Sequence, residues 1–289
     1  MKVLGIGDNV CDKYEHLKMM FPGGQAMNFA VYAKLLGADA SYMGVFGQDE
    51  AADHVIATLD RLEVEHTHCR QYEGENGCAR VTLIDGDRVF LGSNQGGITK
   101  EKPLDLTEED LEYIKTFSHV HTSNNSHFDS QLAKVKSTGV PLSYDFSYRW
   151  NEPDRVERVA PYADYAFLSC GAATEAEAME ICKQMYEAGI HYVIATRGSE
   201  GALFYDGIGF FAQPPKLVKA IDTLGAGDSF ATAFLLSFTE SMKREPEKMT
   251  QDRSYYEHEL KKALEAGSEF AAKTCMVQGA FGYGKPFGG

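Results

Sequence analysis

Long apolar runs, paired cysteines and an excess of positive charge are all missing from this sequence of 289 residues. No segment approaches the roughly 20 apolar residues of a membrane-spanning helix, and the first residues lack the pattern of a signal peptide. The six cysteines form no C-x-x-C pair, which argues against a zinc site or a disulfide framework and favours reduced thiols. Lys and Arg number 28 against 42 Asp and Glu, and the net charge of −14 disfavours nucleic acid and anionic membranes as partners. We therefore expect a cytoplasmic protein.

Strand and helix patterns alternate along most of the chain, which predicts an α/β fold with a doubly wound, mostly parallel sheet flanked by helices. No Pro- or Ser-rich linker divides the sequence, so we expect one domain over residues 1–289. The charged stretch 243–253 is predicted to be an exposed linker before a last long helix. The expected strands are 3–7, 39–45, 119–122, 141–146, 165–168 and 192–195, and the clearest helices are 51–62, 107–117, 175–187 and 257–276.

Residues 71–97 interrupt this alternation with antiparallel material. Two short β runs, 79–84 and 88–91, flank Asp85-Gly86-Asp87, which is a strong hairpin signal. We expect a small antiparallel β lid built mainly from residues of about 12–20 and 71–97. Such a lid covers a ligand site or forms a homodimer contact, and a plain edge hairpin is the alternative.

The most informative stretch is Ile221 to Phe230, in which Gly225 and Gly227 precede an amphipathic segment. A helix that begins directly after a glycine turn directs unpaired N–H groups at an anion, most often a phosphate. Asp228 lies in the first turn, where we expect the helix N-terminus to depress its pKa. An ionised carboxylate beside a phosphate is suited to remove a proton from an attacking hydroxyl. The alternative is an ordinary helix start with an acidic first-turn residue.

Two further groups of residues follow other strands. Thr196, Gly198 and Gly201 lie beyond a strand end, where backbone N–H groups can reach a nucleotide phosphate. Near the amino terminus, several carboxylate, amide and glycine residues are suited to bind the hydroxyls of a polyol. These residues are Asp8, Asn9, Asp12, Gly23, Gly24 and Asn28. Turn and cap chemistry explains each of them singly, but their grouping favours a polyol site.

The chain resembles the ribokinase-like (PfkB) carbohydrate kinases over nearly its whole length. The matching elements are Asp12, Gly23-Gly24 with Asn28, Asp145 with Arg149, Thr196-Arg197-Gly198 and Asp222 to Asp228. The resemblance implies a ribokinase-like fold and ATP-dependent phosphorylation of a sugar hydroxyl. It implies Asp228 as the base, an anion hole at Gly225, Ala226 and Gly227, and nucleotide contacts from Thr196 to Gly201, Arg197 included. It also implies ATP-bound Mg²⁺, and a K⁺ ion near Asp222 and Thr223.

One element of the family pattern is missing. Many members carry an N-x-x-E element that is tied to magnesium placement, but the corresponding stretch here is Ser169 to Glu175, with no Asn and no Glu three residues on. Glu175 and Glu177 are the nearest substitutes. Phosphate-bound Mg²⁺ often keeps mostly water ligands, so the departure concerns side-chain ligation alone.

Short segments beginning at Gly7, Gly74, Asp87, Asp145 and Ala272 are similar to the fructosamine (fructoselysine) 6-kinase branch, which also lacks that element. This resemblance implies a sugar–amino acid adduct as substrate. Glu15, Arg80 and Arg88 are candidates for charges that pair with the amino acid part of this substrate. The alternative is that they are solvated surface charges. A kinase for a plain sugar or nucleoside, and a non-catalytic sugar- or nucleotide-binding protein, remain the competing interpretations.

Overall fold

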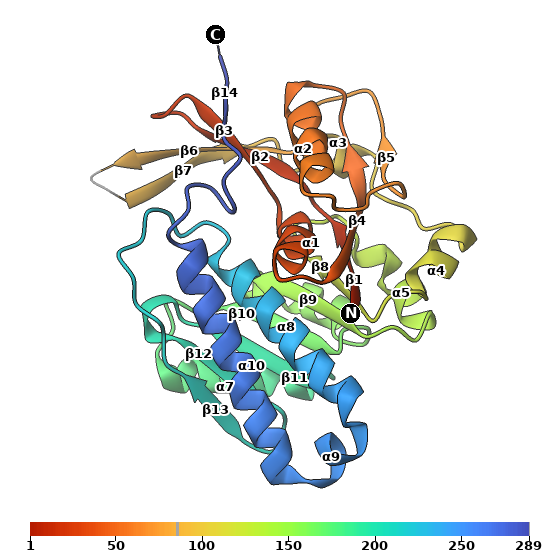
Figure 1. Ribbon diagram of the computed structural model, residues 1–289, viewed down its shortest axis with the longest axis vertical. Helices are drawn as coiled ribbons and strands as arrows, with labels where there is room; N and C mark the ends of the chain where they lie inside the picture. Colours follow the sequence, from red (N-terminus) through yellow and green to blue (C-terminus); the bar gives the residue numbers. More distant parts are fainter. Residues whose placement is uncertain (85–86, 289) are drawn as a thin grey trace.

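A nine-stranded sheet forms the centre of the protein in this computed structural model, which describes residues 1–84 and 87–288 (Figure 1). The strand order is β13-β12-β11-β10-β9-β8-β1-β4-β5. Neighbouring strands from β11 to β5 pair in parallel, whereas β12 and β13 are antiparallel. The strands are β1 (Lys2–Gly7), β4 (Asp39–Phe46), β5 (Arg70–Gln71), β8 (His119–Ser123), β9 (Leu142–Ser147), β10 (Tyr165–Ser169), β11 (Tyr192–Thr196), β12 (Ala202–Tyr205) and β13 (Phe210–Gln213).

Helices cover both faces of this sheet, as alternate residues of β10 show. Tyr165 and Phe167 belong to one apolar cluster, and Ala166 and Leu168 belong to another on the opposite face. In Figure 1, α1 (Gln25–Leu35), α8 (Ala226–Arg244) and α10 (Arg253–Thr274) lie in front of the sheet. The opposite face packs against α4 (Glu108–Ile114), α5 (Leu132–Ser137), α6 (Pro153–Val159) and α7 (Glu175–Glu187). The predicted doubly wound α/β architecture is confirmed.

The apolar face of α8 packs against the large sheet. Phe230, Phe234 and Phe238 recur at helical spacing, and all three are buried against strand residues such as Phe167 and Phe204. Burial of each ring contributes about 1.5–3 kcal/mol. This packing fixes the helix and therefore the position of its N-terminus. No described helix is long and apolar enough to cross a membrane.

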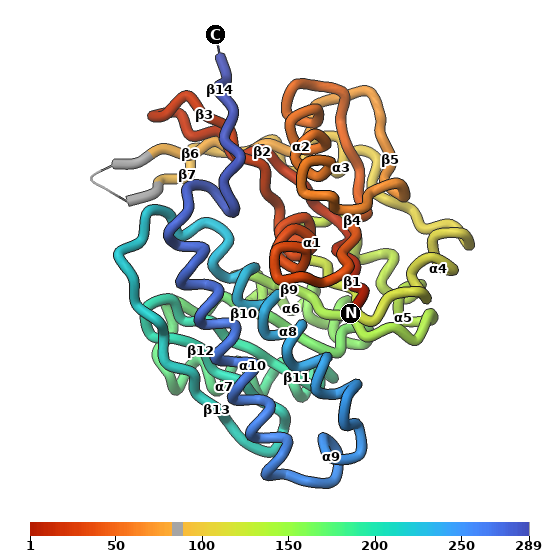
Figure 2. Tube along the Cα trace, viewed as in Figure 1, coloured from red at the N-terminus to blue at the C-terminus, as the bar shows by residue number. Residues whose placement is uncertain are grey.

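A second, five-stranded sheet lies beside the large one, with the order β14-β3-β2-β6-β7. We call it the small sheet. Its strands are β2 (Val10–Tyr14), β3 (Met19–Gly23), β6 (Cys78–Ile84), β7 (Asp87–Ser93) and β14 (Lys285–Pro286). Only the β2–β6 pair is parallel among the described pairs. Figure 2 shows the blue C-terminal segment running beside the red strand β3, so both ends of the sequence contribute to this sheet. The predicted hairpin turn at residues 85–86 lies outside the described residues.

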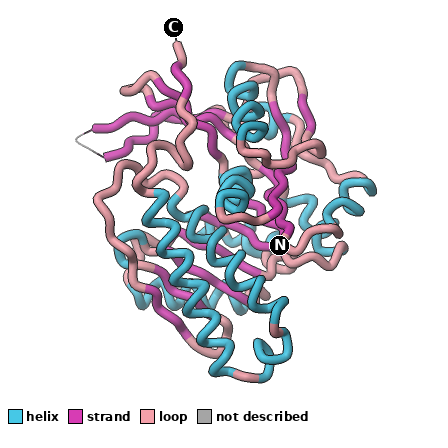
Figure 3. The backbone as a smooth tube through the Cα atoms, in the orientation of Figure 1, coloured by secondary structure: helices cyan, strands magenta, loops and turns pink. Residues whose placement is uncertain are grey.

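The stretch 243–253 is largely exposed, as predicted, but it is mostly helical. A short helix, α9 (Pro246–Gln251), joins α8 to α10, and Figure 3 shows this return as a helical segment. Met249 is buried in the cluster that contains Phe238 and Tyr256. Asp252 then caps α10, because its carboxylate accepts a hydrogen bond from the Tyr255 N–H at 3.1 Å. A single apolar anchor within a charged stretch suffices to hold the segment against the core.

Candidate active site

The carboxyl ends of the parallel strands form the edge at which the predicted site residues gather. The strand order reverses at β1, which has β4 on one side and β8 on the other. Ligands of open α/β sheets bind at such a reversal, outside the carboxyl ends of the strands. Asp8 follows β1, Asp145 lies near the end of β9, and Thr196 ends β11. The N-terminus of α8 contributes to this edge from the covering helix layer, because Asp228 is in contact with Asn28 of α1.

The turn before α8 requires glycine at its first position for steric reasons. Gly225 has φ 76°, a left-handed value, and a Cβ atom there would lie 2.2 Å from the Tyr32 hydroxyl oxygen. Tyr32 in turn donates a hydrogen bond to the carbonyl of Ala280 at 2.5 Å. At Gly227, by contrast, a Cβ atom would meet no described atom within 4 Å. Gly225 therefore shapes the turn, whereas Gly227 presents its backbone to open space in front of the helix N-terminus, as an anion site requires.

Asp228 is a buried carboxylate, and the Asn28 side chain donates a hydrogen bond to its Oδ2 at 2.6 Å. Burial raises the pKa of Asp228, and this effect outweighs the Asn28 hydrogen bond, which lowers it; the charge of Asp8 raises it further. Burial also raises the pKa of Asp145, and the neighbouring charge of Asp228 adds to this increase. The expectation that the helix N-terminus depresses the pKa of Asp228 is therefore wrong, since removal from water dominates. The shift moves the carboxylate toward the range in which a general base is most effective.

Asp12, Gly23 and Asn28 form a polar cradle beside Asp228. A Cβ atom at Gly23 would lie 2.9 Å from Asp12 Oδ2 and 3.7 Å from Asn28 Oδ1, so both oxygens border the same small space. Asn28 Oδ1 is buried and has no hydrogen-bond partner among the described residues. A buried acceptor without a partner is costly unless a ligand satisfies it. This pair of oxygens can accept hydrogen bonds from neighbouring hydroxyls of a sugar.

Asp8, Asn9 and Gly24, which were also predicted to bind substrate, have structural contacts instead of free polar groups. The Asp8 carboxylate accepts hydrogen bonds from the first two N–H groups of α1, at 2.8 and 3.1 Å, and from the hydroxyls of Ser123 and Ser126. The Asn9 amide bonds to the Tyr42 hydroxyl and the Val45 carbonyl. A Cβ at Gly24, with φ 112°, would lie 2.7 Å from the Asp8 carbonyl. These residues hold α1, and with it Asn28, in place.

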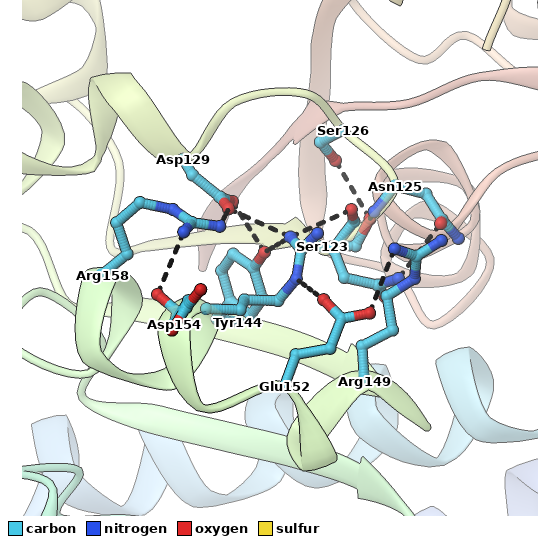
Figure 4. A network of polar contacts seen from close by, with 11 residues as sticks. Ser123, Asn125, Ser126, Asp129, Tyr144, Arg149, Glu152, Asp154 and Arg158 are labelled. Atoms are coloured by element: carbon cyan, nitrogen blue, oxygen red, sulfur yellow. Dashed lines mark hydrogen bonds and ion pairs between the residues drawn. The ribbon is translucent and has the colours of Figure 1, made fainter. Parts of the chain in front are cut away.

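The segment after β9 brings further polar groups to the site. Ser147, with φ 50°, donates its N–H to Asp145 at 2.6 Å. Figure 4 shows Arg149 directed at Glu152, with Ser123 at the end of the neighbouring strand β8 and Asn125 and Ser126 directly after it. Arg149 Nη1 and Glu152 Oε1 are 3.3 Å apart. Gln25 was not predicted from the sequence; its side-chain oxygen accepts a hydrogen bond from Asn125 at 2.8 Å, and its side chain lowers the pKa of Asp145. A polar cluster directly after an expected strand, residues 123–126, was the signal for this part of the site.

The predicted nucleotide loop lies at the end of β11. Gly198 has φ 57° and no described atom within 4 Å of a Cβ position, so its backbone is open to a ligand. Gly201 is structural, since a Cβ would lie 2.1 Å from the Gln213 carbonyl oxygen. The Thr196 hydroxyl bonds to the Leu168 carbonyl at 3.2 Å. Arg197 is buried and pairs with Glu175 at 3.1 Å. The loop therefore offers open backbone at Gly198 on a well-supported turn.

The acidic residues considered as magnesium ligands both have structural partners. Glu175 pairs with Arg197, and Glu177 accepts hydrogen bonds from the Thr174 N–H and hydroxyl in a capping box at the start of α7. Among residues 1–84 and 87–288 no group of three His, Cys, Asp or Glu side chains has the arrangement of a metal site. The described residues therefore fit an Mg²⁺ ion that is held mainly by phosphate and water oxygens.

Asp222, where K⁺ was predicted, lies at the centre of several contacts. Its Oδ1 accepts the Leu224 N–H at 3.0 Å, and its Oδ2 accepts the Gly279 N–H at 3.0 Å and the Tyr14 hydroxyl at 2.5 Å. Thr223 is exposed. The carboxylate thus joins the glycine turn, the C-terminal segment and the small sheet.

Two of the charged residues considered for the amino acid part of a substrate, Glu15 and Arg80, lie on the side of the small sheet that faces away from Asp12. Arg80 shares a register position with Lys13 and pairs with Glu15 at 2.7 Å. Asp12 and Tyr14 alternate with these residues on β2 and therefore face the opposite side. This placement favours the alternative that Glu15 and Arg80 are surface charges. The side chain of Arg88 lies outside the described part of the structure.

Comparison with known proteins agrees with the geometry of the site. The fructosamine kinase FrlD of Bacillus subtilis is 42% identical over 288 residues, covering 99% of this chain and 95% of that protein. The fructoselysine 6-kinase of Escherichia coli is 31% identical, covering 97% of this chain and 100% of that enzyme. The ribokinase of Arabidopsis thaliana, solved with ribose and ATP, superimposes with a TM-score of 0.73 at 20% identity, covering 96% of this chain and 93% of that one. The family model of the pfkB family carbohydrate kinases matches residues 11–282, and the chain therefore belongs to that family.

Proposed function

We propose that the protein is an ATP-dependent kinase that phosphorylates a hydroxyl, O6, of fructoselysine or a related sugar–amino acid adduct. The observation that carries this proposal is the juxtaposition of Asn28 with Asp228 at the start of α8, beside the open backbone of Gly227. The substrate class is supported by the 42% identity to a fructosamine kinase and the 31% identity to a fructoselysine 6-kinase.

In the proposed reaction, Asp12 and Asn28 accept hydrogen bonds from sugar hydroxyls and fix the sugar against β2 and α1. Asp228 accepts the proton of the attacking hydroxyl as the hydroxyl oxygen bonds to the γ-phosphorus of ATP, while the bond from that phosphorus to the bridging oxygen breaks and ADP leaves. The backbone N–H groups of Gly225 and Gly227 face the negative charge on the transferred phosphoryl group, whereas the Ala226 N–H donates to the Thr223 carbonyl at 3.3 Å and supports the turn. Mg²⁺, when bound, neutralises part of the negative charge on the phosphates.

The nucleotide phosphates fit the edge between Gly198 and Gly227, where both glycines present open backbone. A K⁺ ion near Asp222 and Thr223, which the family resemblance implies, belongs to the same proposal. We further propose that the small sheet acts as a lid that excludes water during transfer.

We also propose a cellular location and a mode of association for the protein. The reaction takes place in the cytoplasm, which agrees with six cysteines that are all free thiols. A homodimer forms through the small sheet, where Phe90 and Leu91 of β7 are 63% and 48% exposed. Exposed apolar side chains on a sheet edge favour association with a second chain.

Release of ADP tests the substrate class. The protein is assayed with ATP and Mg²⁺ against fructoselysine, glucoselysine, fructose and ribose at matched concentrations. Preference for a sugar–lysine adduct supports the proposal. Equal or better turnover of fructose or ribose favours the alternative of a plain sugar kinase. Binding of ATP without turnover of any of the four favours a non-catalytic binding protein.

A further inference from the structure

Tyr14 of the small sheet and Asp222 of the glycine turn are in direct contact although 208 residues separate them. The Tyr14 hydroxyl donates to Asp222 Oδ2 at 2.5 Å, and the tyrosine side chain is buried. A hydrogen bond to an ionised carboxylate is about twice as strong as one between neutral groups. Its burial means that water does not replace it at low cost. The contact is therefore a strong link between the two parts of the protein.

The same tyrosine belongs to the strand that carries the proposed sugar ligand. Asp12 and Tyr14 are two residues apart on β2, so both side chains project from the same face of the small sheet. Asp12 borders the cradle at Gly23, and Tyr14 reaches the glycine turn. One short strand thus contacts both halves of the active site.

Asp222 passes this contact on to the backbone of the turn. Asp222 also accepts hydrogen bonds from the N–H groups of Leu224, directly before Gly225, and of Gly279 in the C-terminal segment. A Cβ at Gly279 would lie 2.8 Å from the Phe21 ring, so this segment is also packed closely against β3. The position of the Asp222 carboxylate therefore affects the position of the backbone amides that follow Leu224.

Apolar packing reinforces the link. Tyr14, Phe21 and Val81 form a separate cluster on the inner face of the small sheet, and Leu224 of the glycine turn packs against it. The rings of Tyr14 and Phe21 meet edge to face with centroids 5.0 Å apart. A displacement of the small sheet would move both the hydroxyl and this cluster relative to the turn.

We propose that the Tyr14–Asp222 hydrogen bond couples sugar binding to nucleotide binding. Sugar on Asp12 holds β2 against the active site; Tyr14 then holds Asp222, and Asp222 holds the turn in the conformation that binds phosphate. Tyr14 is a positioning residue, since it acts through Asp222. The inference rests on the proposed function, because it takes a sugar at Asp12 and a nucleotide at Gly225 to Gly227.

Coupling of this kind is reciprocal, so either ligand raises the affinity for the other by the same factor. The coupling also limits hydrolysis of ATP by water, because the turn then binds phosphate well only when a sugar is present. Removal of the hydroxyl alone, in Tyr14→Phe, keeps the ring and its packing and breaks the coupling.

Isothermal titration calorimetry measures the coupling directly. AMP-PNP with Mg²⁺ is titrated into the full-length protein with and without saturating fructoselysine. We expect the sugar to raise nucleotide affinity about 10-fold or more in the wild type, on the scale of one charged hydrogen bond. In Tyr14→Phe we expect that ratio to fall to about 2-fold or less, with the sugar-free affinity little changed.

Tyr113→Phe is the matched control, because Tyr113 also donates its hydroxyl to a carboxylate, Glu65, away from the site. It should keep the wild-type ratio. A ratio in Tyr14→Phe equal to that of the wild type overturns the inference, as does an equal loss of nucleotide affinity with and without sugar, which indicates a structural role. Failure of the proposed function looks different: the wild type then binds no sugar or no nucleotide.

Discussion

The side-chain nitrogen of Asn28 lies 2.6 Å from a carboxylate oxygen of Asp228, 200 residues further along the chain. This contact joins α1, which carries the cradle for sugar hydroxyls, to α8, whose N-terminus is the anion site. It leaves Asn28 Oδ1 directed at the space bordered by Asp12 and Gly23. Asn28, the proposed sugar ligand, and Asp228, the proposed base, therefore hold one another in position.

Asp228→Asn tests the role of the base. The amide keeps the shape of the side chain and can still accept the Asn28 hydrogen bond, but it cannot take a proton. We expect kcat to fall by about 10²–10⁴-fold or more while AMP-PNP binding is retained. Rapid-quench and calorimetric measurements on the same preparation check both parts. A kcat within a few-fold of the wild type would contradict the assignment.

The pH dependence of kcat/KM follows from the raised pKa of Asp228. Activity requires the ionised carboxylate, so kcat/KM should fall as the pH is lowered through a value above the ordinary carboxylate pKa of 3.8. Because the Asn28 hydrogen bond lowers this pKa, Asn28→Ala should move the acidic limb to higher pH, separately from its effect on KM. An acidic limb that does not move in Asn28→Ala would contradict this reading of the contact.

The free energy of unfolding should depend on pH, because Asp145 and Asp228 are carboxylates buried away from water. Asp145 and Asp228 have folded-state pKa values above their unfolded values, so the folded state binds more protons in this window. Their contribution therefore favours folding below the ordinary carboxylate pKa and is lost as the pH rises through the raised values. Asp228→Asn should raise the melting temperature by about 2 °C or more at pH 8 and progressively less toward pH 4. Differential scanning calorimetry at both pH values checks this; a stabilisation that grows on acidification contradicts it.

The two glycines of the turn before α8 should respond differently to alanine. Gly225→Ala meets the Tyr32 hydroxyl and a left-handed backbone, so it should destabilise the fold by about 1–3 kcal/mol. Gly227→Ala has open space around the new methyl group and should fold normally, but the methyl group stands where phosphate binds. Urea titration and AMP-PNP binding separate the two effects. Equal stability losses in both variants would count against the described geometry.

Much of this site follows from sequence patterns because its elements are local. The helix start after Gly225, the buried Phe230, Phe234 and Phe238, and the strands that end near Asp8, Asp145 and Thr196 all depend on residues close in the chain. The pattern places Asp228 at a helix N-terminus, and the structure agrees. Local periodicity and turn chemistry are sufficient for such features.

Other features depend on contacts between distant residues and were not predictable. Asp8 caps α1 with help from Ser123 and Ser126, which lie 115 and 118 residues away. The pKa of Asp228 depends on burial, which the helix position alone does not reveal. Sequence alone also does not tell which face of the small sheet Glu15 and Arg80 occupy, or that they pair with one another.

Asp228 is proposed to act as the base in phosphoryl transfer to O6 of a sugar–amino acid adduct. The most direct test is ³¹P and ¹³C NMR of fructoselysine incubated with ATP, Mg²⁺ and either the wild-type protein or Asp228→Asn. The account predicts a new phosphomonoester coupled to C6 with the wild type and none over the same period with the variant. Phosphate on another oxygen, no phosphoester with the wild type, or equal product with both proteins would contradict it.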